Sequence, residues 1–510
     1  MTSAVSPGSS LVASTEPNNP HPLGPESKDK RPKEDPDALA QQAPKPGLFA
    51  ALWFWFTLGW MSFGGAGTQV SMMYEEFVEK RRWISPHRFT HALSYCMILP
   101  GPEAQQLSIY LGWLMHGPLA GIVAGLLFLI PSFLILTAFG GLYVLYGQIP
   151  ELQALLYGLK PAILAIVLSA CIRLGQRVLV GKLWWAVMLL SVALLQLGAG
   201  FVTVIVVAGI VGWTAYLFAS RPITGLPASL TRHTVDQQPP IGQRYRLARR
   251  LSDQDQQNAV INKRYVIDDD SPRHPRAELD ASRILAVLGI GVALWLLAYG
   301  ALVAYAPPLL AELAAFFSRV ALVSFGSSYA VLPYLFDTMV DARQWVSTGQ
   351  IIDGLAISEI TPGPLTMIST FLGYIASAQH PDLTQFPIAV AGLMGALVVT
   401  VFLFLPSFIF VLAGAPWVEA TRRIPALIAP LTAISAASVA LIFDLALIFA
   451  KFILWPTPSG NWGSFRTLDL VAGLISALAI VLMLQFRMGM VITMLICISL
   501  GVVASALGLP

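Results

Sequence analysis

The chain has 510 residues, of which 56% are hydrophobic and only 12% are charged, with a formal net charge of +3 at pH 7. Its mean hydropathy of +0.68 is far above that of soluble domains, so the composition excludes an ordinary soluble protein and a basic protein that binds nucleic acid. The three cysteines lie singly in apolar stretches and form neither a disulfide framework nor a metal-ligand pattern. We therefore predict an all-α polytopic membrane protein without a metal or other cofactor.

The chain divides into four parts by composition. Residues 1–47 are rich in Pro, Ser, Asn and charge and lack the apolar core of a signal peptide, so we expect a disordered tail. We expect a first membrane repeat at 48–220, a polar linker at 221–282, and a second membrane repeat with an extra leading helix at 283–510. The Lys and Arg residues near membrane ends place the linker in the cytoplasm.

Apolar runs long enough to cross the hydrocarbon core recur along the chain, since about 20 helical residues are needed for a crossing. Further spans are expected inside the repeated stretches, which gives about 12 to 13 transmembrane segments in total. The clear candidates are 118–147, 151–175, 201–219, 283–305, 386–414, 424–450, 467–485 and 487–508.

Two stretches of the chain are nearly the same in sequence. Each contains Ser-Phe-Gly, then Arg-x-Trp, then Pro-Gly-Pro at one spacing, and each ends in Pro-Ser-Phe after one residue of slippage. Such a repeat in an apolar chain is typical of a transporter made of two related halves, with its site where the halves meet. The motifs are Ser62–Gly65, Arg81–Trp83, Pro100–Pro102 and Pro131–Phe133, then Ser324–Ser327, Arg343–Trp345, Pro362–Pro364 and Pro406–Phe408.

The relative orientation of the repeats follows from counting crossings. An even number separates the amino terminus from the linker if both are cytoplasmic, and the extra leading helix at 283–305 then makes the separation of the repeats odd. An odd separation inverts the second copy. We therefore predict two inverted-topology repeats, an architecture used for alternating access.

Both Pro-Gly-Pro motifs are expected to break a helix, because two backbone donors are lost around a flexible glycine. Such breaks at membrane depth lie beside protein or a watery cavity, and the helix that follows offers N–H groups to an anion. The alternative is that Gly and Pro are simply frequent in transmembrane helices. The residues predicted to bind substrate through these turns are Gly64, Gly65, Pro100, Gly101, Pro102, Gln105, Gly326, Pro362, Gly363 and Pro364.

Four charged residues near the motifs are further candidates for the site. Arg81 and Arg343 match across the repeats and suit a tetrahedral oxyanion, although an interfacial Arg-Trp anchor is at least as good an explanation. Glu103 and Glu359 lie beside the breaks and are candidates for proton coupling, with helix capping as the alternative.

Other ionisable residues lie deep in apolar sequence. Arg173 and Asp444 occupy near-matching places in the two halves and form a possible intramembrane pair. Lys160 precedes Pro161, and we expect its side chain to snorkel toward the membrane surface. No nucleotide-binding signature and no nucleophile-base or metal constellation is visible, so we predict transport driven by an ion gradient rather than an enzyme.

The motifs carry a family resemblance. Ser62–Gly65, the acidic pair Glu75–Glu76 before Arg81–Ser85, and Leu99–Pro102 followed by Gln105 and Gln106 resemble the signature of the chromate ion transporter family. The repeat resembles the long two-domain form of that family.

The resemblance implies a multi-pass protein of the bacterial cytoplasmic (inner) membrane. It implies an antiporter that expels chromate with the proton-motive force and so confers chromate resistance. Three alternatives stay open, namely a sulfate transporter, a transporter of another oxyanion, and a passive anion channel. The expected partners are chromate or sulfate as substrate, the proton gradient and the lipid bilayer, and an oligomer is possible.

Overall fold

The computed structural model describes residues 47–63, 65–147, 149–218, 266–267, 281–325, 328–420, 425–456 and 468–508. All of them belong to one compact unit, Ala43–Pro510. Gly64, Gly326, the predicted tail up to residue 46 and nearly all of the predicted linker 221–282 therefore lie outside the described residues.

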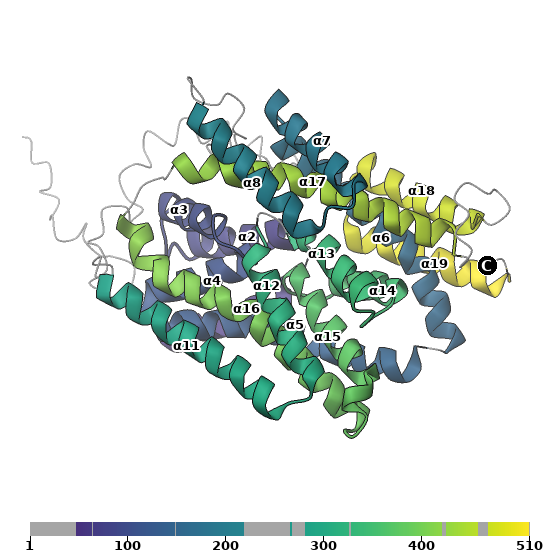
Figure 1. The fold of residues 1–510 in the computed structure, drawn as a ribbon, viewed down its shortest axis with the longest axis horizontal. Coiled ribbons are helices and arrows are strands. Elements are labelled where there is room, and N and C mark those ends of the chain that lie inside the picture. The colour runs from purple at the N-terminus through teal and green to yellow at the C-terminus, as the bar shows by residue number, and fades with distance from the viewer. Residues whose placement is uncertain are drawn as a thin grey trace, which may run out of the picture. The chain divides into compact units, whose positions relative to one another are not determined.

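The described residues are helical apart from turns and one isolated bridge (Figure 1). The first half contains α1 (Leu48–Met61), α2 (Gly65–Tyr74), η2 (Glu75–Lys80), α3 (Pro86–Cys96), α4 (Glu103–His116), α5 (Pro118–Tyr146), α6 (Pro150–Val178), α7 (Lys182–Gln196) and α8 (Phe201–Phe218). The second half contains α11 (Ala281–Tyr305), α12 (Pro308–Val323), η3 (Ser328–Val331), α13 (Leu332–Phe336), η4 (Asp337–Ala342), α14 (Thr348–Ile360), η5 (Leu365–Met367), α15 (Ile368–Gln379), η6 (Pro381–Leu383), α16 (Ile388–Ala420), α17 (Pro425–Leu454), α18 (Leu470–Leu484) and α19 (Met490–Ala506).

The all-α polytopic fold is confirmed. Within the described ranges, six helices are long and apolar enough to cross a membrane, namely α5, α6, α8 and parts of α11, α16 and α17. The remaining two clear candidates are also helices, although α18 has 15 residues and α19 has 17. The short apolar helix α7 was not predicted as a span.

The repeated stretches fold as short helices rather than as complete spans, because glycine and proline interrupt them. The total of about 12 to 13 crossings therefore stays a prediction. In both copies a π-helix, η2 or η4, leads into the Arg-x-Trp motif, and the middle residue of that motif has a positive φ of 52° at Arg82 and 53° at Gln344. The two copies thus share local structure, and their inverted orientation stays a prediction.

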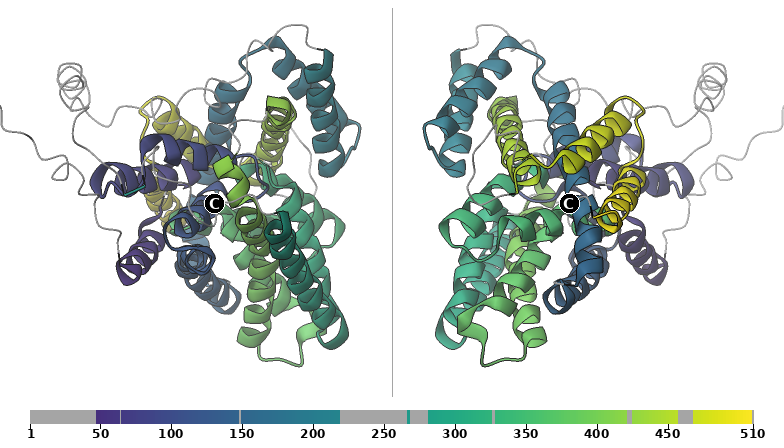
Figure 2. Two further views of the ribbon diagram at one scale, coloured as in Figure 1. Left: turned by 90° about the vertical axis from the view of Figure 1, so that its left-hand side faces the viewer. Right: turned by 90° about the vertical axis from the view of Figure 1, so that its right-hand side faces the viewer.

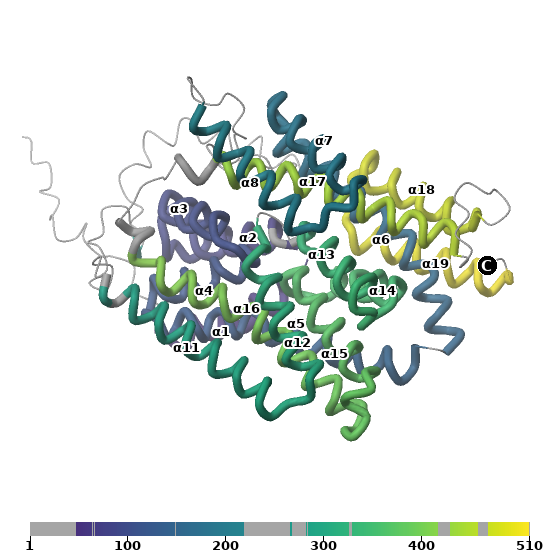
Figure 3. The backbone as a smooth tube through the Cα atoms, viewed as in Figure 1, coloured from purple at the N-terminus to yellow at the C-terminus, as the bar shows by residue number. Residues whose placement is uncertain are grey.

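The two halves interleave. Helix α5 of the first half packs against α15 and α16 of the second, and α6 packs against α17, α18 and α19. Figure 1 shows α6 beside the yellow helices at the end of the chain, and Figure 3 traces the same arrangement as a tube. The teal and green helices α11, α12, α15 and α16 form one bundle (Figure 2). Burial between the halves therefore comes mainly from the long apolar helices.

A short piece of the predicted linker lies on the first repeat. Ile267 forms a parallel bridge with Ile84, and its N–H group donates to the carbonyl of Trp83 over 2.9 Å. Val266 is 8% exposed and belongs to the hydrophobic core. These two residues thus pack against the segment that follows η2.

Candidate functional site

Both Pro-Gly-Pro motifs break the helical path, as predicted. The first lies between α3 and α4, and the second lies between α14 and η5. Gly101 and Gly363 adopt φ values of +122° and +118°, which residues with a β-carbon rarely adopt. Pro102 and Pro364 then stand at the N-cap positions of α4 and η5, where the missing N–H group of proline costs no helical hydrogen bond.

The two breaks are tied to the opposite halves by matching backbone hydrogen bonds. The N–H group of Gly101 donates to the carbonyl oxygen of Ser324 over 2.7 Å, and that of Gly363 donates to the carbonyl oxygen of Ser62 over 2.9 Å. Ser62 and Ser324 are the first residues of the repeated Ser-Phe-Gly motif. Each Pro-Gly-Pro motif is therefore bonded to the Ser-Phe-Gly motif of the other copy.

The repeated Pro-Ser-Phe motifs meet the same glycines. A β-carbon built on Gly363 would lie 2.5 Å from the Oγ atom of Ser132 on α5, and one built on Gly101 would overlap the hydroxyl group of Ser407 on α16. Both serines are buried, and neither glycine leaves room for a side chain. Three of the four repeated motifs, Ser-Phe-Gly, Pro-Gly-Pro and Pro-Ser-Phe, thus converge between the halves, and the serine contacts exist only because the glycines lack side chains.

These bonds change how an anion could use the breaks. The N–H groups of Gly101 and Gly363 are already donated to carbonyl oxygens, so they are not the free donors that the sequence suggested. The first turn of α4 remains available, since its early N–H groups have no helical acceptor and the N-cap residue Pro102 makes no side-chain hydrogen bond to them. Any backbone anion site therefore begins at Glu103 rather than at the glycine.

Several buried side chains around the breaks have polar atoms without a hydrogen-bond partner in the described part of the chain. Buried polar groups are normally satisfied, so a cluster of exceptions marks a place for a ligand or ordered water. Gln105 is unpaired at both its Oε1 and Nε2 atoms. The remaining hydroxyl donors follow the second break or face it, and they are Ser132, Thr366 and Ser369.

Two glutamines hold the breaks together while presenting their oxygen atoms. Gln69 of α2 donates from Nε2 to the carbonyl oxygen of Gly363 over 2.7 Å, and Gln106 of α4 donates to that of Pro100 over 2.6 Å. Both amide groups are fully buried, and neither Oε1 atom has a partner among the described residues. Gln69 therefore adds a further bond between the halves.

The positive charge of one arginine of α6 acts on each candidate carboxylate, although no ion pair joins them among the described residues. Glu359, which is 4% exposed, accepts a hydrogen bond of 2.6 Å from the hydroxyl group of Tyr329, and the charge of Arg173 acts on it. Glu103 begins α4, and the charge of Arg177 acts on it. Arg173 and Arg177 are one helical turn apart and both are exposed. The arginines therefore bring positive charge to both carboxylates.

Arg173 does not form the predicted ion pair with Asp444. Among the described residues no ion pair joins Arg173 and Asp444, and the carboxylate on which the charge of Arg173 acts is Glu359. Asp444 lies partly buried on α17. The prediction depended on the near-matching positions of Arg173 and Asp444 in the two repeats. Matching positions in two repeats need not be in contact, because contact depends on how the helices of the two halves pack.

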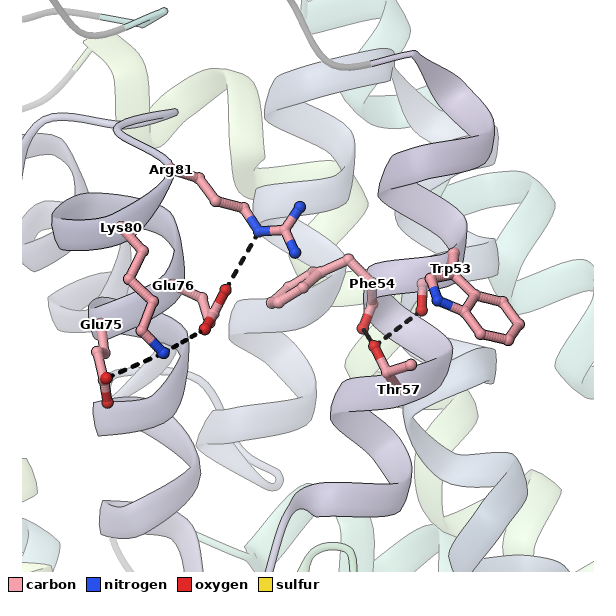
Figure 4. A network of polar contacts seen from close by, with 7 residues as sticks. All are labelled: Trp53, Phe54, Thr57, Glu75, Glu76, Lys80 and Arg81. Carbon is pink, nitrogen blue, oxygen red and sulfur yellow. Dashed lines mark hydrogen bonds and ion pairs between the residues drawn. The ribbon is translucent and has the colours of Figure 1, made fainter.

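Arg81 and Arg343 make surface contacts. Arg81 pairs through Nε with Glu76 at 3.2 Å and its guanidinium group lies over the ring of Phe54 (Figure 4). It also lies over the ring of Trp83. Arg343 pairs with Glu312 at 2.9 Å and lies over the ring of Trp345. Their side chains are 41% and 55% exposed, and none of these contacts is with a residue of the breaks. The geometry is that of the Arg-Trp anchor that the sequence left open.

Gly65 starts α2 with a φ of +82°, and no described atom lies within 4 Å of the place of its β-carbon. It therefore borders open space, as a backbone donor to a ligand should. No group of three or more His, Cys, Asp or Glu within the described ranges is placed to hold a metal ion.

Sequence reasoning missed several residues of this site. Ser132 and Ser407 were seen only as the ends of the repeats, although their duplication was a usable signal. Tyr329 and Arg177 carried no such signal, because neither is matched across the repeats.

Comparison with known proteins gives one family. The family model described as chromate transporter matches residues 49–213 and again 311–502, so the chain contains two copies of it. The chain is 25% identical to a chromate transport protein of Cupriavidus metallidurans, over 89% of this chain and 93% of that protein. It is 28% identical to one of Pseudomonas aeruginosa, over 82% and 86%, and 24% identical to a probable one of Synechococcus elongatus, over 84% and 90%. No solved structure matches.

Proposed function

The chain belongs to the chromate transporter family, and we propose that it exports chromate across the bacterial cytoplasmic membrane and thereby confers chromate resistance. The relatives are named as transport proteins, and the helices suit a multi-pass membrane protein. In this proposal the proton-motive force supplies the energy, and the two halves alternate in opening to either side.

The reciprocal bonding of the two breaks is the observation that carries this proposal. Gly101 bonds to Ser324 and Gly363 bonds to Ser62, so both breaks lie between the halves. A relative movement of the halves would have to exchange these bonds and expose the buried donors around them. Alternating access requires such a bistable contact at the site.

The donors near the breaks suit a tetrahedral dianion. Gln105, Ser132, Thr366 and Ser369 offer neutral donors without partners among the described residues. Arg173 adds charge from α6, and Glu359 competes with an anion for that arginine. When the carboxylate is protonated it no longer competes for the arginine, so the binding of the anion depends on the protonation state of the carboxylate. We propose that Glu359, and likewise Glu103, couple transport to protons in this way.

The electrical part of the proton-motive force favours export. Moving two negative charges out of a negative interior gains about 4.6 kcal/mol per 100 mV, twice the value for one charge. A potential alone could therefore drive a dianion outward, and the pH gradient would add to this only through a titrating carboxylate.

Reconstituted vesicles test the proposal. Chromate should accumulate against its gradient on the positive side when a potential is imposed, and excess sulfate should compete. With the potential clamped at zero, a pH gradient should drive uphill movement through a proton-coupled carrier and a proton ionophore should abolish it, whereas flux through a passive channel would follow only the potential and the concentration gradient of chromate. Transport that is indifferent to both potential and pH gradient would refute the coupled mechanism, and indifference to sulfate would refute a general oxyanion site.

A further inference from the structure

A second polar site lies away from the breaks. A pocket of about 480 Å³ is formed between the end of α5, the start of α6 and the start of α14. None of its lining residues belongs to a Pro-Gly-Pro, Ser-Phe-Gly or Pro-Ser-Phe motif. We call it the lysine pocket, and its polar lining includes Tyr143, Tyr157, Lys160, Gln350 and Asp353.

Asp353 is a buried carboxylate with one oxygen atom left over. It is 3% exposed, and its Oδ2 atom accepts a hydrogen bond of 2.8 Å from the hydroxyl group of Tyr143. Its Oδ1 atom lies 3.9 Å from Nζ of Lys160, which is too far for a hydrogen bond, and has no hydrogen-bond partner in the described part of the chain. The ion pair is therefore loose, although a buried charge normally requires close partners.

Lys160 carries donors that this pairing leaves unused. Its ammonium group has three N–H donors, it lies 6.0 Å from the ring centre of Phe452, and its side chain is 30% exposed. The expected snorkelling is therefore not a simple escape to the membrane surface, because the ammonium group faces a polar pocket and an acid. A small anion could accept from these donors at about 2.8 Å while the longer contact with Asp353 persists.

The lysine pocket is connected to the second break by one helix. Asp353 lies on α14, which ends at Ile360 just before Pro362, about 10 Å further along the helix axis. The pocket reaches from the turn at Gly147 and Pro150 to Lys160, which lies about 15 Å along α6. The second break therefore lies at the other end of the helix that carries Asp353.

We propose that the lysine pocket is a second binding site, one for a tetrahedral oxyanion, in which the ligand accepts hydrogen bonds from the unused donors of Lys160 while the ion pair with Asp353 persists. The proposal rests on the proposed function, since an oxyanion transporter needs an entry site. Asp353 keeps the affinity low by its negative charge, and weak binding suits a site that must release its ligand onward. Free oxyanions and anionic lipid headgroups share this chemistry, and the proposal commits to the free ion.

A local chemical probe separates this site from the breaks. Ala154 lines the pocket, and the natural cysteines Cys96, Cys171 and Cys497 are all buried. In the full chain carrying Ala154→Cys, sodium sulfate should slow modification by an anionic methanethiosulfonate reagent in lipid-free detergent. Sodium chloride at equal ionic strength should not do so, because it screens charge without offering a tetrahedral oxyanion.

Matched variants identify the groups. Lys160→Met should weaken the sulfate protection about tenfold or more, whereas Asp353→Asn, which can still accept from Tyr143, should strengthen it about tenfold. Lys182→Met, at an exposed lysine of α7, should leave it unchanged. Protection that is absent, or that survives Lys160→Met, overturns the proposal. Protection by phosphatidylglycerol in bilayers, with none by sulfate, also overturns it and indicates a lipid site.

The measurement is independent of transport. Sulfate protection in a protein that moves no chromate would leave the lysine pocket standing and remove the proposed function. Normal chromate transport without sulfate protection would remove the pocket alone.

Discussion

The contact between Gly101 and Ser407 yields the sharpest prediction. Gly101→Ala places a methyl group against the Ser407 hydroxyl and 2.6 Å from Nε2 of Gln106, at a φ of +122° that alanine disfavours. Backbone strain of this kind costs about 1–3 kcal/mol, and overpacking costs about 1–3 kcal/mol more. We expect the variant to lose transport and to unfold at a lower temperature, because the cost falls on the interface between the halves.

A double variant separates the two costs. Adding Ser407→Gly removes the clash with the serine but leaves the φ strain and the close contact with Gln106, so it should recover part of the lost stability and not all of it. Gly289→Ala on α11 is the matched control, since no described atom lies within 4 Å of the added carbon. Chromate flux and thermal unfolding of the purified protein measure both quantities. Wild-type flux and stability in Gly101→Ala would refute the interface argument, as would full recovery in the double variant.

Three further predictions follow from the charged residues. Glu359→Gln should lower the KM for chromate, because it removes the negative charge that competes with chromate for Arg173. The variant should also abolish the response of chromate flux to a pH gradient, and an unchanged response would show that Glu359 does not couple transport to protons. Arg173→Met should reduce chromate flux at least tenfold while Asp444→Asn stays within twofold of wild type, and equal losses would restore the predicted pair. Partial burial raises the pKa of Glu76, but the hydrogen bonds and charges of Lys80 and Arg81 outweigh it and lower that pKa below 4.5. The ionised Glu76 carboxylate therefore stabilises the fold above pH 4.5, and this stabilisation is lost as the pH falls through the lowered pKa. The difference in Tm between wild type and Glu76→Gln should therefore be small at neutral pH and vanish in acid, and a difference that grows in acid would contradict this.

The sequence alone determined the features that depend on neighbouring residues. Long apolar runs gave α5, α6, α8, α11, α16 and α17, because a helix in lipid must satisfy its backbone internally. The Pro-Gly-Pro motifs determined the helix breaks, because steric limits on φ act within a few residues. The duplicated motifs also indicated two halves, and the family model matches the chain twice.

Only the tertiary structure decided which groups meet. Gly101 bonds to Ser324 and Gly363 to Ser62, and these contacts depend on how helices distant in sequence pack. The same packing left Asp444 outside the reach of Arg173 and set Lys160 opposite Asp353. A local pattern can predict that a buried charge or a bare backbone needs a partner. It does not identify the partner, because many chain arrangements bury the same apolar surface at nearly the same free energy.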